Sequence, residues 1–326
     1  MSHIFDALQR SEAERSGNTS SPLSTITDLL ERAERGASSL WDTALERERL
    51  GAESGREVDT LPGAPATSAK TAVLPEAETA PDDGNSGGFH ECETLHLSLT
   101  PQNRLVTVSD VDSPAAEAFR LLSVRLRHLR RDRDLKKVLI TSTIPQEGKS
   151  MVSANLACAL AASTRRKTLL LEGDVRRPSL SKVFGLRPHP GLCEYLEGTR
   201  SLVSSIYRLE PGGIWLFPAG NAPANPLELL ESAKLPGLME QLAASFDWIV
   251  IDSPPVLPLA DTSVWTRLAD GILLVTRQGT TQKRHLQRGL EALEPKKVIG
   301  AVLNSSRNSS DNEYYSYRRP PEGAAD

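Results

Sequence analysis

Several features that mark common protein classes are sparse or missing in this sequence. Its 326 residues include only 3 cysteines, and the spacing of Cys92, Cys158 and Cys193 matches no metal-binding pattern. They are typical of reduced thiols in a cytoplasmic protein. No apolar run approaches the roughly 18 residues of a membrane span. Residues 1–10 are amphipathic and lack the apolar core of a signal peptide, so we expect no cleaved leader.

The sequence also lacks a strong charge of either sign and an internal repeat. Its formal net charge is −4, which implies no general affinity for nucleic acid. The composition is otherwise that of an ordinary water-soluble protein, long enough for one or two domains.

Composition divides the chain into four segments. In residues 1–50, apolar residues recur at roughly helical spacing among charges, which predicts an N-terminal helical extension; a partly disordered extension is the alternative. Residues 51–93 are rich in proline, alanine, threonine, serine, glycine and acidic side chains, and are predicted to be a flexible linker. Residues 94–304 are predicted to form the folded domain, and residues 305–326 a disordered, tyrosine-bearing tail.

Within the folded domain, short apolar runs alternate with helical patterns. Residues 95–108 are expected to form strands or extended arms, and Ser113 and Pro114 are expected to start a helix that runs to about Arg131. The strands expected after it are 138–141, 168–171, 214–217, 248–251, 272–275 and 298–303. This alternation predicts an α/β fold, a mostly parallel sheet with helices on both faces.

The first of these apolar runs leads into a phosphate-binding pattern. Residues 137–155 read KVLITSTIPQEGKSMVSAN, a strand, a polar turn, Gly148-Lys149-Ser150 and a helix. Gly148 would let the backbone approach a phosphate, Lys149 would reach the β- and γ-phosphates, and the Ser150 hydroxyl would bind Mg²⁺. Thr143 stands where the motif has its first glycine. The alternative is an ordinary strand–turn–helix with an exposed lysine.

Acidic residues follow two other expected strands. Asp252 comes directly after the strand 248–251, and Glu172 and Asp174 follow the strand 168–171. Parallel strands present their carboxyl ends at one edge, so these carboxylates should lie near the phosphate loop, where one could hold Mg²⁺. Taken alone, the acidic residues after either strand could also simply cap the end of that strand.

These motifs, in this order, resemble the catalytic domain of the bacterial tyrosine kinases (BY-kinases), which control capsule and exopolysaccharide synthesis. The resemblance covers about residues 114–317. The matching segments are the Walker A loop at 142–150, the Walker A′ motif at 169–176, the intervening segment at 220–232, the Walker B motif at 249–255 and the tyrosine tail.

The resemblance implies a P-loop fold and roles for individual residues. Lys149 would be catalytic, Asp174 and Asp252 would serve a metal ion together with Ser150, and Glu172 stands where the family has an aspartate proposed to activate the tyrosine hydroxyl. The implied nucleotide contacts are Thr143, Gln146, Glu147, Gly148, Lys149, Ser150, Met151 and Asn304. The implied phosphate acceptors are Tyr314, Tyr315 and Tyr317.

The resemblance further implies an ATP- and Mg²⁺-dependent tyrosine autokinase that regulates polysaccharide synthesis or export. Its implied partner is a separate membrane-spanning polysaccharide co-polymerase or activator, which would hold the protein at the inner face of the plasma membrane. Self-association is implied by a family helix motif, Glu-x-x-Arg-x-x-Arg. Here Glu117 and Arg120 match it, while Ser123 replaces its last arginine.

Two other functions stay open at this point. One is a partitioning-type ATPase with a deviant phosphate loop, a class that places a second lysine five residues before the loop lysine; this sequence has Ile144 there. The other is a nucleotide-binding regulator with weak or no catalysis, for which Glu172 in place of aspartate is the motivation.

Overall fold

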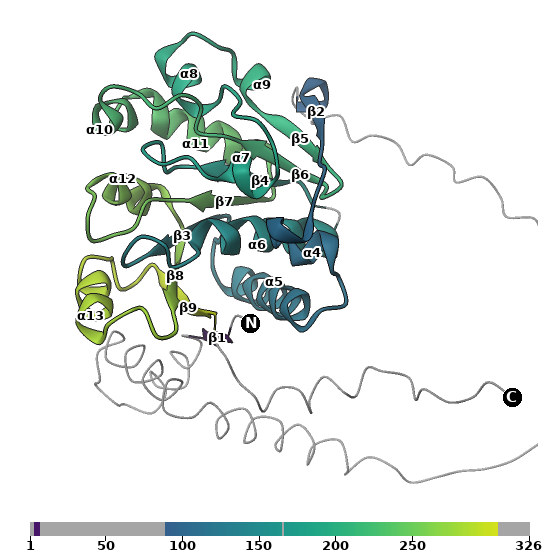
Figure 1. The fold of residues 1–326 in the computed structure, drawn as a ribbon. Coiled ribbons are helices and arrows are strands. Elements are labelled where there is room, and N and C mark those ends of the chain that lie inside the picture. Colours follow the sequence, from purple (N-terminus) through teal and green to yellow (C-terminus); the bar gives the residue numbers. More distant parts are fainter. Residues whose placement is uncertain (1–2, 7–88, 165, 306–326) are drawn as a thin grey trace, which may run out of the picture.

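The computed structural model describes residues 3–6, 89–164 and 166–305. In these residues nine strands form one sheet in the order β1-β9-β8-β3-β7-β4-β6-β5-β2 (Figure 1). The strands are β1 His3–Asp6, β2 Glu93–His96, β3 Lys137–Ser142, β4 Thr168–Glu172, β5 Tyr207–Glu210, β6 Ile214–Phe217, β7 Trp248–Asp252, β8 Gly271–Arg277 and β9 Val298–Asn304.

The central strands of the sheet run parallel to one another, which confirms the predicted α/β fold. Strands β9, β8, β3, β7, β4 and β6 share one direction. Only the margins differ, where β1 pairs antiparallel with β9, and β5 pairs antiparallel with β6 and parallel with β2. The carboxyl ends of β3, β7 and β4, which are neighbours in the sheet, therefore meet at one edge.

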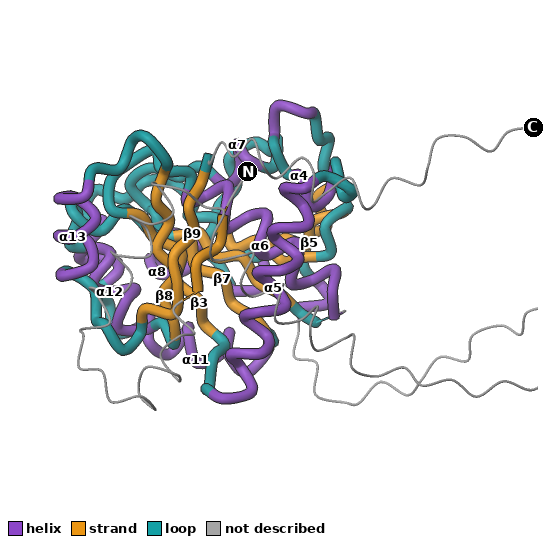
Figure 2. The backbone as a smooth tube through the Cα atoms, turned by 90° about the horizontal axis from the view of Figure 1, so that it is seen from below, coloured by secondary structure: helices purple, strands orange, loops and turns teal. Residues whose placement is uncertain are grey.

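Helices cover both faces of this sheet, as Figure 2 shows from a second direction. The helices are α4 Val106–Ser109, α5 Pro114–Asp132, α6 Lys149–Thr164, α7 Leu180–Val183, α8 Leu192–Glu197, α9 Leu202–Ser205, α10 Pro226–Leu230, α11 Lys234–Ser245, α12 Asp261–Leu268 and α13 Lys283–Glu291, with short 3₁₀ turns at Phe89–Glu91 and Pro101–Asn103. One core joins α4, α5, α6 and α7 to the sheet, and a second joins α8, α11, α12 and α13 to the other face.

The alternation of side chains along β3 shows why helices must cover both faces of the sheet. Val138 and Ile140 belong to the core beneath α5 and α6, whereas Leu139 belongs to the opposite core. All three are 0% exposed. Successive residues of a strand point to opposite faces, so a continuous apolar run can be buried only between two layers of helices.

Helix α5 begins where its sequence predicts. The Ser113 hydroxyl accepts a hydrogen bond from the Ala116 N–H at 3.2 Å, and Pro114 occupies the first turn. Leu122 and Leu126 are buried against α6 and the sheet. Arg130 covers the edge of the core, with its guanidinium 4.8 Å from the centre of the Trp248 ring.

The structure differs from the sequence prediction at the margins of the sheet. Residues 3–6 form a strand that extends the sheet, not a helix, and the rest of the predicted helical extension lies outside the described residues. The predicted linker also ends earlier than residue 93, because Phe89 is buried with its ring centre 5.1 Å from that of Phe246. Residues 106–109, expected to be extended, form α4, and β5 was not predicted.

Among the helices of the described ranges, none combines the length and apolarity that crossing a membrane requires.

Candidate nucleotide-binding site

The phosphate loop joins β3 to α6 in the predicted place. Gly148, with φ of 91°, adopts a backbone conformation that favours glycine. A Cβ atom at Gly148 would lie 2.1 Å from Nδ2 of Asn304. That same Nδ2 donates a hydrogen bond to the carbonyl oxygen of Glu147 at 2.9 Å, which ties the loop to the end of β9. The first turn of α6 then presents backbone N–H groups that lack intrahelical partners, the usual setting for a phosphate.

Glu147 stabilises the loop from within. Its side chain is 0% exposed. It accepts hydrogen bonds from the Thr143 hydroxyl at 2.9 Å, from the Ile144 N–H at 2.9 Å, and from the Thr281 hydroxyl. The side chains of Glu147 and Thr143, both predicted as nucleotide contacts, are therefore engaged with each other, and a nucleotide contact from these residues would come from the backbone.

Two other predicted contacts lie within the loop and in the first turn of the helix that follows it. Gln146 is exposed with φ of 68°, and its carbonyl oxygen accepts a hydrogen bond from Arg277 of β8 at 3.3 Å. Met151 is half-buried in the first turn of α6, beside Lys149 and Ser150. Their contact with a nucleotide stays a prediction.

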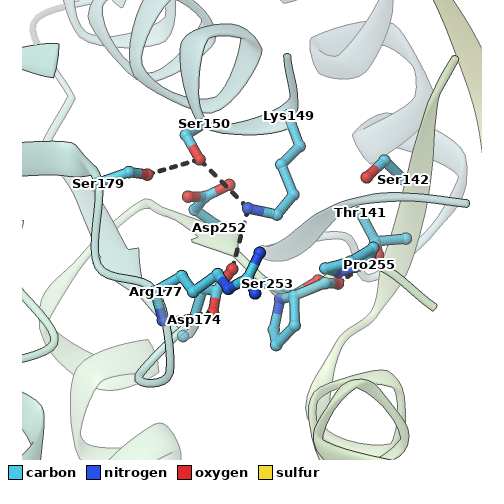
Figure 3. A network of polar contacts seen from close by, with 12 residues as sticks. Thr141, Ser142, Lys149, Ser150, Asp174, Arg177, Ser179, Asp252, Ser253 and Pro255 are labelled. Carbon is cyan, nitrogen blue, oxygen red and sulfur yellow. Dashed lines mark hydrogen bonds and ion pairs between the residues drawn. The ribbon is translucent and has the colours of Figure 1, made fainter. Parts of the chain in front are cut away.

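Lys149 lies among the strand-end carboxylates, as Figure 3 shows. Its Nζ is 3.1 Å from Oδ2 of Asp174 and 3.4 Å from Oγ of Ser150. Burial alone would lower the pKa of the Lys149 ammonium, but the charges of Asp252 and Asp174 outweigh it and raise the pKa. The lysine therefore stays protonated and can neutralise phosphate charge.

Asp252 combines deep burial with an unpaired oxygen. It is 0% exposed, and its Oδ1 accepts a hydrogen bond from Ser153 of α6 at 3.0 Å. Its Oδ2 is buried without a hydrogen-bond partner. Burial raises the pKa of Asp252, and the ammonium of Lys149 partly offsets this rise. A buried carboxylate oxygen with no partner is costly unless a cation or a water molecule satisfies it.

The oxygen groups around Asp252 fit Mg²⁺. Ser150, Asp174 and Asp252 supply a hydroxyl and two carboxylates, hard oxygen ligands that suit this ion. Within the described ranges, no group of three or more His, Cys, Asp or Glu side chains could hold a metal ion by itself. In phosphoryl-transfer sites, Mg²⁺ is usually held by one or two carboxylates together with substrate phosphates.

Glu172 lies at the predicted strand end but does not face the site as expected. It is paired in register with Asp252 and is 1% exposed. Its carboxylate accepts hydrogen bonds from the backbone N–H groups of Ser179, Leu180 and Ala219. Burial raises its pKa, although these hydrogen bonds counteract the rise. This arrangement does not fit the implied role of activating a tyrosine hydroxyl.

Several polar residues of the site were not predicted. Ser153 binds Asp252, and the Ser179 hydroxyl donates to the Ser150 hydroxyl at 2.9 Å. Arg176 makes a bidentate ion pair with the buried Asp261, at 2.6 and 3.0 Å. The sequence held one usable signal, since Ser153 follows Ser150 by three residues and so lies on the same side of the helix.

Trp265 of α12 packs against the Walker A′ turn, which we define as residues 173–179, between β4 and α7. Its indole N–H donates to the Gly173 carbonyl at 3.1 Å, and a Cβ atom at Gly173 would lie 2.7 Å from the ring. Glycine is therefore required between Glu172 and Asp174 by this close approach. The implied acceptors Tyr314, Tyr315 and Tyr317 lie outside the described residues.

The parallel sheet, the phosphate loop and the strand-end carboxylates define a nucleotide-binding domain of the P-loop class. The chain is 32% identical over 218 residues to the tyrosine-protein kinase YwqD of Bacillus subtilis (strain 168), an alignment that covers 66% of this chain and 92% of that protein. The chain therefore belongs to the bacterial tyrosine kinase family, and by enzyme class it is a protein tyrosine kinase.

Further comparisons agree with this assignment. The chain is 35% identical over 213 residues to the succinoglycan biosynthesis transport protein ExoP of Rhizobium meliloti (strain 1021), covering 63% of this chain but 27% of that protein. The crystal structure of the chimerical protein CapA2B2 matches with a TM-score of 0.60 and 28% identity, covering 65% of this chain and 93% of that one. No family model matches the chain.

Proposed function

We propose that this protein transfers the γ-phosphate of ATP to tyrosines of its own C-terminal tail, with Mg²⁺ bound by Ser150, Asp174 and Asp252. One observation carries the proposal. The Lys149 ammonium lies 3.1 Å from Asp174 at the phosphate loop, beside the buried Asp252, whose Oδ2 has no partner. One cation and two carboxylates therefore lie at the carboxyl ends of three neighbouring strands, which supports the proposed role of both carboxylates in holding Mg²⁺.

The reaction requires little covalent chemistry from the protein. The tyrosine oxygen bonds to the γ-phosphorus, the bond from that phosphorus to the bridging oxygen of ADP breaks, and the phenolic proton passes to a base. Lys149 and the backbone N–H groups of the loop hold the phosphates, so that positioning and charge neutralisation supply most of the rate. Bound Mg²⁺ would supply further neutralisation of phosphate charge.

The proposed acceptors are Tyr314, Tyr315 and Tyr317. Strand β9 ends at Asn304, at the same edge of the sheet as the phosphate loop, so the tail starts beside the site. The ten residues from Asn304 to Tyr314 span at most roughly 36 Å. That reach permits transfer within one chain or between chains, and the family resemblance favours transfer between chains.

Such transfer requires self-association, for which α5 is the proposed contact. Arg120 is already held within its own chain, by Glu117 at 2.6 Å and by the carbonyl of Val111. Ser123 is buried and donates to the Arg120 carbonyl, so it adds no charge to the surface. We expect an association weaker than a stable ring and weakened further by salt, because exposed charges are screened.

The proposed setting is the regulation of exopolysaccharide or capsule synthesis at the inner face of the plasma membrane. There a separate membrane-spanning activator or co-polymerase would bind the kinase. Support comes from the relative named as a succinoglycan biosynthesis transport protein. No role in nucleic-acid binding is proposed.

The test is to incubate the pure protein with ATP and Mg²⁺ and to measure phosphotyrosine and free phosphate together. Lys149→Met should fold and bring phosphotyrosine down by on the order of 10²–10³-fold, because it removes the phosphate-binding charge. Lys296→Met, an exposed residue before β9 at the opposite edge, is the matched control and should keep full activity. Release of free phosphate without phosphotyrosine would instead support the partitioning-type ATPase.

A mixing experiment tests transfer between chains. A Lys149→Met chain with an intact tail is combined with an active chain truncated after Ser306. Phosphotyrosine on the Lys149→Met tail supports transfer between chains. Phosphotyrosine that forms only on an intact active chain refutes it.

A further inference from the structure

Glu172 uses both of its carboxylate oxygens to bind backbone. Its Oε1 accepts hydrogen bonds from the N–H groups of Ser179 and Leu180, the latter at 2.7 Å, and its Oε2 accepts one from Ala219 at 3.0 Å. A carboxylate offers roughly four acceptor positions, so these three bonds leave little capacity for another partner. The side chain is 1% exposed, so a substrate hydroxyl has no open path to it.

These three hydrogen bonds connect the end of β4 to two other segments, of which one is distant in sequence. Ser179 and Leu180 lie at the start of α7, after the turn that carries Asp174, and Ala219 follows β6. Glu172 therefore fixes both ends of the Walker A′ turn, since its own backbone begins the turn and its side chain binds the residues that finish it. Without Glu172, the buried N–H group of Leu180 would lose the partner that the structure gives it.

Ser179 connects Glu172 to the phosphate loop. Its backbone N–H binds Glu172, while its hydroxyl donates to the Ser150 hydroxyl at 2.9 Å, a contact drawn in Figure 3. Ser150 is the proposed Mg²⁺ ligand from the phosphate loop. Two successive hydrogen bonds through Ser179 thus connect Glu172 to Ser150.

We infer that Glu172 is a positioning residue that sets Ser179, and through it Ser150, for Mg²⁺–nucleotide binding, and that it is not the base of the reaction. The inference rests on the proposed function only where phosphotyrosine is the readout. Nucleotide binding tests it separately, so a failure of the autokinase proposal can be told from a failure of this one.

The length of the side chain makes the inference testable. Aspartate in its place is shorter by one carbon–carbon bond, about 1.5 Å. Hydrogen bonds of 2.7 and 3.0 Å to opposite sides cannot both survive such a loss. Glutamine keeps the length, but its NH₂ group would face a backbone N–H group on one side. Both variants should therefore loosen the turn, aspartate at least as much as glutamine.

The experiment measures ADP affinity with and without Mg²⁺, by titration calorimetry, for Glu172→Asp, Glu172→Gln and Ser179→Ala. We expect Glu172→Asp to weaken Mg²⁺-dependent ADP binding by roughly tenfold or more and to lower phosphotyrosine in parallel. Ser179→Ala should weaken the Mg²⁺-dependent part in the same direction, while ADP binding without Mg²⁺ stays near that of the parent. Glu240→Asp, an exposed position on α11, is the control for the same truncation.

Two outcomes would overturn the inference. If Glu172→Asp phosphorylates as fast as the parent or faster, while Glu172→Gln binds Mg²⁺–ADP normally but loses phosphotyrosine, then Glu172 is the base. If Ser179→Ala shows an unchanged Mg²⁺ dependence, then the link through Ser179 does not exist. This second measurement decides the question even if Glu172→Asp fails to fold.

Discussion

Gly289 of α13 lies directly against Thr143 of the phosphate loop. A Cβ atom at Gly289 would be 2.4 Å from Cγ2 of Thr143 and 3.2 Å from its Cβ. The motif usually has a glycine at the position of Thr143, so the Thr143 side chain must be accommodated by a neighbouring element. Because Gly289 has no side chain, the Thr143 side chain fits between the loop and α13. The backbone of the loop can therefore keep its conformation although the first glycine of the motif is absent.

We expect Gly289→Ala to push Thr143 and the start of the loop out of place. Overpacking of this kind costs roughly 1–3 kcal/mol, so the affinity for ADP should fall by about tenfold. The double variant Gly289→Ala with Thr143→Gly should recover part of that affinity, because it restores the space. Gly237→Ala is the matched control, since a Cβ atom there would meet nothing within 4 Å. Titration with ADP checks all four proteins, and no loss of affinity in Gly289→Ala would contradict the prediction.

Asp252→Asn should stabilise the protein without ligand while it impairs nucleotide binding. Burial raises the pKa of Asp252, so the ionised carboxylate costs free energy in the folded state. This cost is absent below the ordinary pKa of an aspartate and is incurred as the pH rises through the raised folded-state value. The midpoint of thermal unfolding should therefore rise at pH 7 to 8, and this gain should shrink at acidic pH.

The same Asp252→Asn protein should lose most of the stabilisation that Mg²⁺–ADP gives the parent, because one proposed metal ligand is weakened. Asp134→Asn, at an exposed position, should change neither property. An Asp252→Asn protein that is stabilised by Mg²⁺–ADP as strongly as the parent would show that this carboxylate does not serve the metal.

Glu194→Gln should destabilise the protein at neutral pH only. Burial would raise the pKa of Glu194, but hydrogen bonds from the N–H groups of Gly191 and Asn221 outweigh it and lower the pKa. A lowered pKa contributes stability above the ordinary value for a glutamate, and this contribution is lost as the pH falls through the folded-state value. We expect a loss of about 1 kcal/mol at pH 7, allowing for the partial exposure of the side chain.

Denaturant unfolding at several pH values checks this prediction. The difference between Glu194→Gln and the parent should vanish below the pKa of the folded protein. Glu197→Gln, an exposed position on the same helix, should stay within about 0.5 kcal/mol of the parent at every pH. An equal loss for Glu194→Gln at acidic and neutral pH would contradict the assignment.

The three cysteines should react slowly with iodoacetamide in the native protein at pH 8. Burial raises the pKa of Cys92 to about 11, and of Cys158 and Cys193 to about 12, so the reactive thiolate is scarce. Mass spectrometry should find all three labelled rapidly once guanidinium is added. Rapid native labelling of Cys92 alone would instead support the longer flexible linker that the sequence predicts.

The sequence alone determined the central layer of the fold and the identity of the loop. The apolar runs at 138–140 and 248–251 lie in buried strands, as predicted, because a run without polar residues is stable only between two layers. The spacing of Gly148, Lys149 and Ser150 identified the loop, because that motif acts through its own backbone. Asp252 was located for the same local reason, as an acidic residue at the end of a buried strand.

The tertiary structure decided what local patterns leave open. Strands β1 and β5 form because the edge of a neighbouring strand is available for pairing. The sequence of such a short segment does not indicate which strand it will pair with. The direction of Glu172 was not predictable, because the backbone N–H groups that bind it come from Ser179, Leu180 and Ala219, which reach it only when the sheet is assembled. Likewise, no pattern in the sequence connects Thr143 to Gly289, because the space between them exists only where α13 packs against the phosphate loop.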